Sequence, residues 1–209
     1  MSKNFEKYID AFTHLRTDRN RNYWGKESCF GAPHKPFLLL SVMDLAAQGQ
    51  ITENLITPSQ ELVETFNGYW RLVMPPERTA SMAYPFFHLQ SDGFWHLEPL
   101  PGRRVPKTAT TPSMAWLRRN FAGARLDEDL FVFLLDTVCR EQLRMVLVHK
   151  YFDKEVRPRV AEQGFVNFVA FAYARDLIAT AAEATFLSRR RPLHSCGYRP
   201  PGFPRLRRC

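Results

Sequence analysis

Hydrophobic side chains recur every three or four residues at the start of the chain, at Phe5, Tyr8, Ile9, Phe12 and Leu15. This spacing places them on one stripe of an α-helix and predicts an amphipathic helix over roughly residues 3–17. A polar and basic loop follows the helix and ends at the tetrapeptide Pro33-His34-Lys35-Pro36. The first helix should therefore pack one face on the core, and the loop after it should lead to His34 and Lys35.

A second segment, from Pro36 to Gly49, is almost entirely apolar. Pro36 suits the first turn of a helix, because its missing N–H costs nothing there, and Gly49 suits a left-handed stop. Since hardly any polar face remains between them, we expect a central, buried helix. The flanking prolines should restrict the backbone around His34 and Lys35, which a rigid helix supports from behind.

The next stretches predict a third helix and then a hairpin. Thr57 and Gln60 form a capping-box pattern with Pro58 in the first turn, so a helix should start there. Residues 84–98 change to β character, because aromatic and branched residues flank Ser91-Asp92-Gly93, which is typical of a hairpin turn.

From about residue 113 to residue 186 the pattern is helical again, in pieces that begin near Ser113, Asp127, Thr137 and Pro158. The predicted fold class is α+β and predominantly helical. A small antiparallel β-hairpin or sheet is expected around residues 84–98.

The composition changes abruptly at Leu187. Residues 188–209 contain seven arginines, four prolines and no acid, which is typical of a disordered tail. Such a bias is also what an out-of-frame reading of GC-rich coding sequence yields, so a truncated or frameshifted end is a hypothesis. We predict one folded domain over residues 1–187 and a tail over residues 188–209.

The net charge of +8 lies mainly in that tail, which holds +7 and leaves about +1 for the folded part. Residues 1–35 alone carry +3. A basic surface of the domain itself should therefore form around the N-terminal segment, where nucleic acid is the expected kind of partner.

The sequence contains neither a signal-peptide pattern nor an apolar run long enough to span a membrane. Its four cysteines form no Cys-x-x-Cys pair, so reduced thiols are expected. These features predict a soluble, cytoplasmic protein that does not partner a membrane.

Signals for catalysis and metal binding are weak. The acids at 127–129 fall in the first turn of a predicted helix, where the helix dipole favours them. Cys29 precedes His34 by five residues, but no orienting acid accompanies the pair. Zinc-type ligands group only loosely, in the tail: His194, Cys196 and Cys209. We therefore predict no catalytic residue, no metal site and no cofactor.

Several motifs occur in an order that matches a known family. They are "HLRTDRNR" (14–21), "APHKPFLLL" (32–40), "YWRLV" (69–73), "YPFFHLQSDGFW" (84–95), "DEDLFVFLL" (127–135) and "HKYF" (149–152). In this order they resemble the ScoMcrA-like DNA sulfur-binding domain, the N-terminal domain of type IV, modification-dependent restriction endonucleases. The resemblance spans about residues 5–187 and implies binding of phosphorothioate-modified double-stranded DNA.

The resemblance also implies roles for particular residues. Tyr84 and Pro85 would line the sulfur pocket, and His34 and Lys35 would reach the modified linkage and nearby base edges. His88 would complete the pocket wall, on alternating strand spacing with Phe86. The expected phosphate contacts come from three arginines of the first loop: Arg16, Arg19 and Arg21.

Members of the family usually continue into an HNH nuclease domain, which this sequence does not contain. Two functional hypotheses therefore stay open. In the first, the chain is the DNA-recognition module of a modification-dependent restriction system. In the second, it is a restriction endonuclease that cleaves with a partner subunit or through an unrecognised site.

Overall fold

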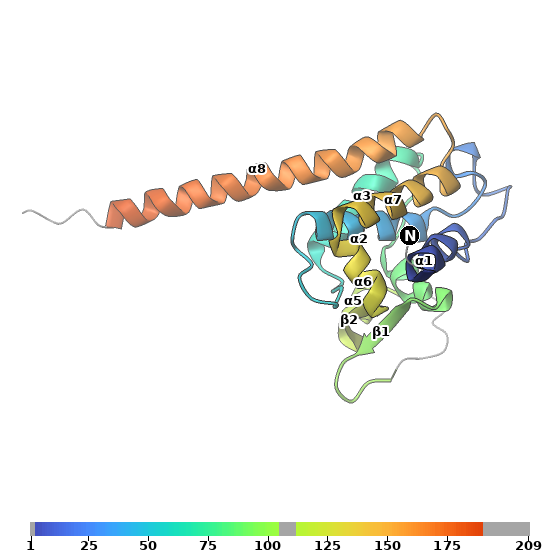
Figure 1. Cartoon of the computed structure of the whole chain (residues 1–209), viewed down its shortest axis with the longest axis horizontal. Helices are drawn as coiled ribbons and strands as arrows, with labels where there is room; N and C mark the ends of the chain where they lie inside the picture. Colours follow the sequence, from blue (N-terminus) through green and yellow to red (C-terminus); the bar gives the residue numbers. More distant parts are fainter. Residues whose placement is uncertain (1–2, 105–111, 190–209) are drawn as a thin grey trace, which may run out of the picture. The chain divides into compact units, whose positions relative to one another are not determined.

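The structure is a computed structural model that describes residues 3–104 and 112–189, with side chains described as far as residue 181. Within these residues the chain forms eight α-helices, two short 3-10 helices and two strands. The α-helices are α1 (Lys3–Thr13), α2 (His34–Ala47), α3 (Gln60–Val73), α4 (Ala83–His88), α5 (Met114–Asn120), α6 (Glu128–Leu135), α7 (Thr137–Tyr151) and α8 (Arg157–Arg189). The 3-10 helices are η1 (Lys26–Ser28) and η2 (Leu89–Asp92), and the strands are β1 (Trp95–Pro99) and β2 (Phe121–Leu126). The predicted class, mostly helical with a small antiparallel sheet, is confirmed (Figure 1).

Residues up to Ala172 form one compact unit, and a second unit begins at Tyr173 and continues helix α8 within the described residues. The boundary that the sequence predicted, after residue 187, falls inside this last helix. Residues 190–209 of the predicted tail lie outside the described residues.

Helix α2 is the centre of the first unit and packs against α3, α4, α6 and α7 (Figure 1). Every residue from Lys35 to Ala46 is buried, as the unbroken apolar run predicts. The helix begins at His34 rather than at Pro36, which still lies in the first turn, where no helical N–H bond is lost. Gly49 follows the helix with a φ of +70°, the left-handed conformation expected of a helix stop.

The predicted hairpin over residues 84–98 is wrong in its first half. Residues 83–92 form α4 and η2, in which Tyr84 and His88 lie four positions apart on one face, while Pro85, Phe86 and Phe87 are buried. Aromatic residues favour a strand only where alternate side chains pack on a pleated sheet. Here consecutive side chains are buried in the core, which a strand with one buried face would not allow. The turn at Gly93, with a φ of +86°, leads into β1 as expected.

The partner of β1 is β2, which the sequence pattern did not reveal. The two strands pair antiparallel with Trp95 opposite Leu126 and Leu97 opposite Ala124. Gly123 sits where a Cβ atom would lie 2.5 Å from the carbonyl oxygen of Ile56, so the chain needs a glycine there. A segment this rich in glycine and alanine between two helices carries little strand signal of its own.

The predicted helix boundaries hold with small shifts. The N-cap residues of α5 and α7 are Ser113 and Asp136, whose side chains accept hydrogen bonds from backbone N–H groups in the first turn. The third helix is capped by Ser59 rather than through a Thr57–Gln60 box, and the first helix ends at Thr13 instead of residue 17.

A buried polar cluster joins α2 to helices α3, α7 and α8. Asp44 of α2 forms an ion pair with Arg144 of α7 at 2.8 Å, and both side chains are almost fully buried. The hydroxyl of Tyr69 in α3 donates to Asp44 at 2.9 Å, and the amide of Asn167 in α8 donates to it at 2.5 Å. The charge of Asp44 is therefore held by donors from three other helices.

Replacing Arg144 by methionine should lower the free energy of unfolding by about 3–5 kcal/mol, because the Asp44 carboxylate would stay buried without its cation. Urea denaturation measures the loss. Arg175→Met, which removes an arginine whose side chain is 67% exposed, is the control and should change stability by less than about 1 kcal/mol. Equal stability of the two variants would contradict a structural role for the cluster.

Candidate functional site

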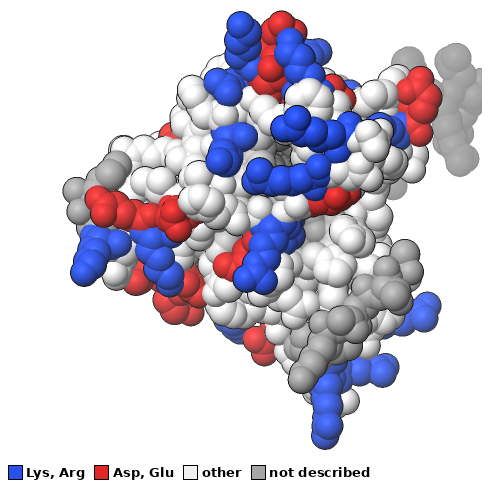
Figure 2. Space-filling view, turned by 90° about the vertical axis from the view of Figure 1, so that its right-hand side faces the viewer, with Lys and Arg blue, Asp and Glu red and all other residues white. Residues whose placement is uncertain are grey.

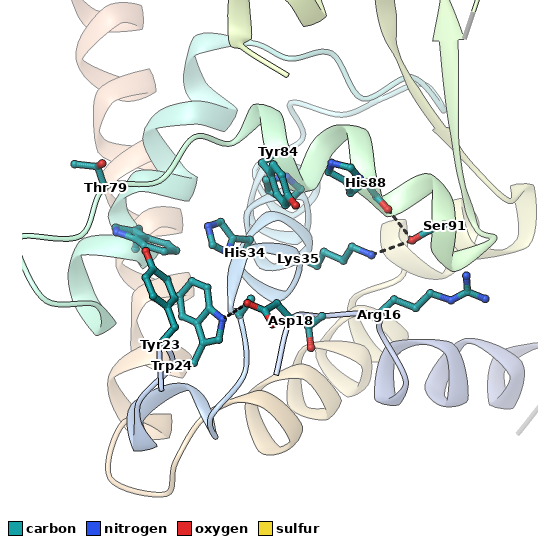
Figure 3. A pocket seen from close by; sticks show the side chains of 14 residues that line it. Arg16, Asp18, Tyr23, Trp24, His34, Lys35, Thr79, Tyr84, His88 and Ser91 are labelled. Atoms are coloured by element: carbon teal, nitrogen blue, oxygen red, sulfur yellow. Dashed lines mark hydrogen bonds between the residues drawn. The ribbon is translucent and has the colours of Figure 1, made fainter. Parts of the chain in front are cut away.

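A pocket of about 430 Å³ opens beside the start of α2, between the loop after α1, the end of α3 and helix α4 (Figure 3). Six of the eight residues that the sequence singled out line it: Arg16, His34, Lys35, Tyr84, Pro85 and His88. The other side chains that line it are Thr17, Asp18, Tyr23, Trp24, Ala32, Trp70, Thr79 and Ser91. Arg19 and Arg21 do not line it.

His34 stands in the middle of an aromatic cluster. Its ring centroid lies 4.7 Å from that of Trp70, 5.4 Å from that of Trp24 and 6.1 Å from that of Tyr84. Burial lowers the pKa of His34 to about 4, although the charge of Asp18 acts in the opposite direction. The imidazole is therefore neutral at neutral pH.

Hydrogen bonds at the back of the cluster fix the two tryptophans. The indole N–H of Trp24 donates to Asp18 at 2.9 Å, and that of Trp70 donates to the backbone carbonyl of Arg78 at 2.7 Å. Both rings are 5% exposed, so they form walls of the pocket rather than surface groups. Tyr84, by contrast, is 48% exposed and stands at the mouth.

His88 lies behind Tyr84, with the two ring centroids 4.3 Å apart. Burial lowers its pKa, and the positive charge of Lys35 adds to the effect. Its Nε2 atom is buried and has no hydrogen-bond partner within the described part of the chain. His88 lines the pocket, but it comes from a helix and not from the strand that the sequence predicted.

Lys35 points along the pocket floor toward η2 and not out of it (Figure 3). Its ammonium group forms an ion pair with Asp92 and a hydrogen bond of 3.1 Å to the hydroxyl of Ser91. The two charged side chains are only 8% and 3% exposed. The family resemblance implied that Lys35 faces the DNA, and the structure instead pairs it with a buried carboxylate.

Asp92 also accepts a hydrogen bond of 2.8 Å from the backbone N–H of Arg16. One carboxylate thus joins the first turn of α2 to the loop that follows α1. The side chain of Arg16 itself extends away from the aromatic cluster (Figure 3).

The arginines of the first loop are exposed. Arg21 lies over the ring of Phe30, with 5.4 Å between the guanidinium carbon and the ring centroid. Figure 2 shows a face of the molecule on which Lys and Arg side chains gather around a hollow, with acidic side chains beside them. The predicted basic surface near the N-terminal segment is consistent with the exposure of Arg16, Arg19 and Arg21.

Sequence reasoning missed part of the pocket wall. Tyr23 and Trp24 form an aromatic pair inside a polar loop, and that contrast was the available signal. Asp18 lies inside the motif of residues 14–21 but was not assigned to the pocket, and Thr79 carries no signal of its own, because isolated polar residues in loops are common. Their place at the pocket depends on how the loops fold back on α2 and α3.

In the described ranges, 3–104 and 112–189, no group of three or more His, Cys, Asp or Glu side chains could hold a metal ion. No helix in those ranges is long and apolar enough to cross a membrane.

Comparison with known proteins gives one family. The model of the ScoMcrA-like DNA sulfur-binding domain matches residues 6–163, which is about three quarters of the chain. The chain is thus a DNA sulfur-binding domain by its family, and it belongs to the ScoMcrA-like family. A search of curated proteins finds no match. All residues that line the pocket fall inside the matched range.

The low pKa of His34 makes stability depend on pH. The unfolded chain binds a proton to this imidazole below about pH 6.5, whereas the folded chain does so only near pH 4. The folded state should therefore lose about 2 kcal/mol between pH 7 and pH 5 through this group alone. Urea midpoints across that range measure the loss. His34→Gln should reduce it by about that amount and the exposed His149→Gln should not, so parallel curves for both variants would contradict the assignment.

Removing Lys35 should destabilise the fold as well as alter the pocket. Lys35→Ala leaves the Asp92 carboxylate buried without its ammonium partner, which costs about 3–5 kcal/mol. Lys7→Ala is the matched control, because Lys7 pairs with Asp127 at 3.0 Å but is 64% exposed, and it should cost less than about 1 kcal/mol. The double variant Lys35→Met with Asp92→Asn should recover part of the loss in urea denaturation. No recovery would show that the lysine acts other than through Asp92.

Proposed function

We propose that this chain binds double-stranded DNA that carries a phosphorothioate linkage, and that it does so through the pocket at the start of α2. It would serve as the recognition module of a modification-dependent restriction system. The observation that carries the proposal is that His34, Tyr84 and Pro85, from two motifs 50 residues apart in the sequence, line one pocket.

The chemistry of the pocket suits sulfur better than oxygen. A non-bridging oxygen of a phosphate is a strong hydrogen-bond acceptor, and placing it against the rings of Tyr84 and Pro85 leaves it without donors. That desolvation costs about 1–3 kcal/mol, whereas the larger and more polarisable sulfur accepts hydrogen bonds weakly and loses less. The neutral imidazole of His34 supports the preference, because an imidazolium would attract the oxygen instead.

The remaining predicted residues have places in this arrangement. Lys35 is paired with Asp92, so it would not bind DNA as a free cation. It would instead fix the floor of the pocket and the position of the loop after α1. Arg16, Arg19 and Arg21 would contact neighbouring phosphates, which adds affinity without sequence information.

The test is a comparison of two duplexes of one sequence, one with a single phosphorothioate and one with ordinary phosphate. Fluorescence anisotropy at fixed salt should give roughly 5- to 150-fold tighter binding of the sulfur duplex, from the desolvation difference. Equal affinity for the two duplexes would remove the proposal.

Tyr84→Ala and Pro85→Ala should each lower the ratio of the two affinities by about tenfold, while the affinity for the ordinary duplex changes little. Tyr173→Ala replaces another exposed tyrosine, outside the residues that line the pocket, and is the control. Thermal unfolding of each variant confirms that the fold is retained. An unchanged ratio in both pocket variants would place the sulfur elsewhere.

A further inference from the structure

The inside of the pocket offers an anionic linkage almost no free positive charge. His34 is neutral, Lys35 is paired with Asp92, and Arg16 extends away from the aromatic cluster. Asp18 lines the same pocket, and a carboxylate there opposes an anion. A bound phosphorothioate keeps its negative charge, and a cation at the rim has to balance it.

Arg78 is placed to supply that cation. It lies in the segment after α3, next to Thr79, which lines the pocket. Its guanidinium carbon stands 4.4 Å from the ring centroid of Tyr23 and 5.5 Å from that of Trp24. Both rings belong to the pocket wall, so the charge is stacked against residues of that wall.

The position of Arg78 is fixed by its backbone as well as by its side chain. Its N–H donates to the carbonyl of Pro75 at 3.0 Å, and its own carbonyl accepts the indole N–H of Trp70 at 2.7 Å. Because the backbone is fixed and the guanidinium group stacks on the two rings, the side chain loses little conformational entropy when it binds a ligand.

The donors of Arg78 are not used up within the protein. Its Nη1 atom is buried and has no hydrogen-bond partner, and no carboxylate forms an ion pair with Arg78 in the part of the chain that the structure describes. The buried Arg144 of α7 differs in this respect, since its guanidinium group pairs with Asp44 and donates to the hydroxyl of Tyr69. A purely structural arginine is expected to be satisfied in the same way.

We propose that Arg78 is a phosphate-binding residue at the rim of the pocket, which contacts an anionic oxygen of the bound linkage or of the phosphate next to it. The inference rests on the proposed function, because it takes DNA as the ligand. The contact of Arg78 would add affinity for any DNA backbone, with or without sulfur, whereas the proposed pocket distinguishes sulfur from oxygen.

The experiment measures binding of the phosphorothioate duplex and of the ordinary duplex between 50 and 200 mM salt, conditions under which phosphate contacts determine the slope. Arg78→Gln should weaken both duplexes by about tenfold and lower the slope of log K against log salt by about 0.9, with an unchanged ratio between the duplexes. Arg125→Gln is the control, because Arg125 already pairs with Glu98 at 3.2 Å, and it should leave the slope near that of the unsubstituted protein.

A neutral methylphosphonate, placed in turn at each phosphate around the sulfur, locates the contact. At one position the unsubstituted protein should lose about tenfold in affinity while Arg78→Gln loses nothing further. An unchanged slope in a folded Arg78→Gln variant, or the absence of such a position, would overturn the inference. If Arg78→Gln does not fold, Arg78→Lys takes its place: the penalty at that position should shrink while the slope is kept, and an undiminished penalty would count against Arg78.

The two proposals fail separately. If the unsubstituted protein binds both duplexes equally, the sulfur pocket is refuted whatever Arg78 does. If the sulfur preference is present but Arg78→Gln leaves the slope of log K against log salt unchanged, only the phosphate contact is refuted.

Discussion

The ion pair between Lys35 and Asp92 determines both the shape and the charge of the pocket. Asp92 binds the ammonium group from the first turn of α2 and the backbone N–H of Arg16 from the loop after α1. Three segments that are far apart in the sequence are thereby held around one space. Burial lowers the pKa of Lys35 and the contact with Asp92 raises it, so the pair is maintained at the expense of desolvating both charges.

Burial of the apolar side chains of α2 offsets that cost. The same helix is buried along its length and is held at its far end by Asp44, which binds Arg144, Tyr69 and Asn167. Each end of the helix therefore carries a charged group fixed by partners from other elements. A helix that is anchored in this way can present His34 at its first turn with little freedom to move.

The sequence predicted the helical elements because their signals are local. The apolar run of α2, the helix starts near Ser113 and Thr137, and the stop at Gly49 are all visible in a few neighbouring residues. The strand β2 was not predictable in the same way, because its pairing with β1 and its contact with Ile56 are tertiary. For the same reason the aromatic run at residues 84–89 was assigned to a strand, although the core accepts it as a helix.

The residues of the candidate site also divide into those with a local sequence signal and those placed by tertiary contacts. The motifs around His34 and Tyr84 are short enough to recognise, and they do come together. The orientation of Lys35 could not be read from its neighbours in the sequence, since the carboxylate that binds it lies 57 residues away. Nor could the stacking of Arg78 on Tyr23, because the two residues meet only when the loops before α2 and after α3 fold together.

A pocket with little free charge has a consequence for how affinity and selectivity would be combined. A cation placed inside would attract oxygen and sulfur linkages alike and would favour the harder oxygen through stronger hydrogen bonds. In the proposed arrangement the cations stand at the rim, at Arg78 and the arginines of the first loop, and the interior would distinguish the two atoms by desolvation alone. Salt would then weaken binding to both kinds of DNA together, because it screens the rim and hardly reaches the buried wall. Selectivity of this kind would be a property of the apolar surface at Tyr84 and Pro85, and it would require that His34 stay neutral.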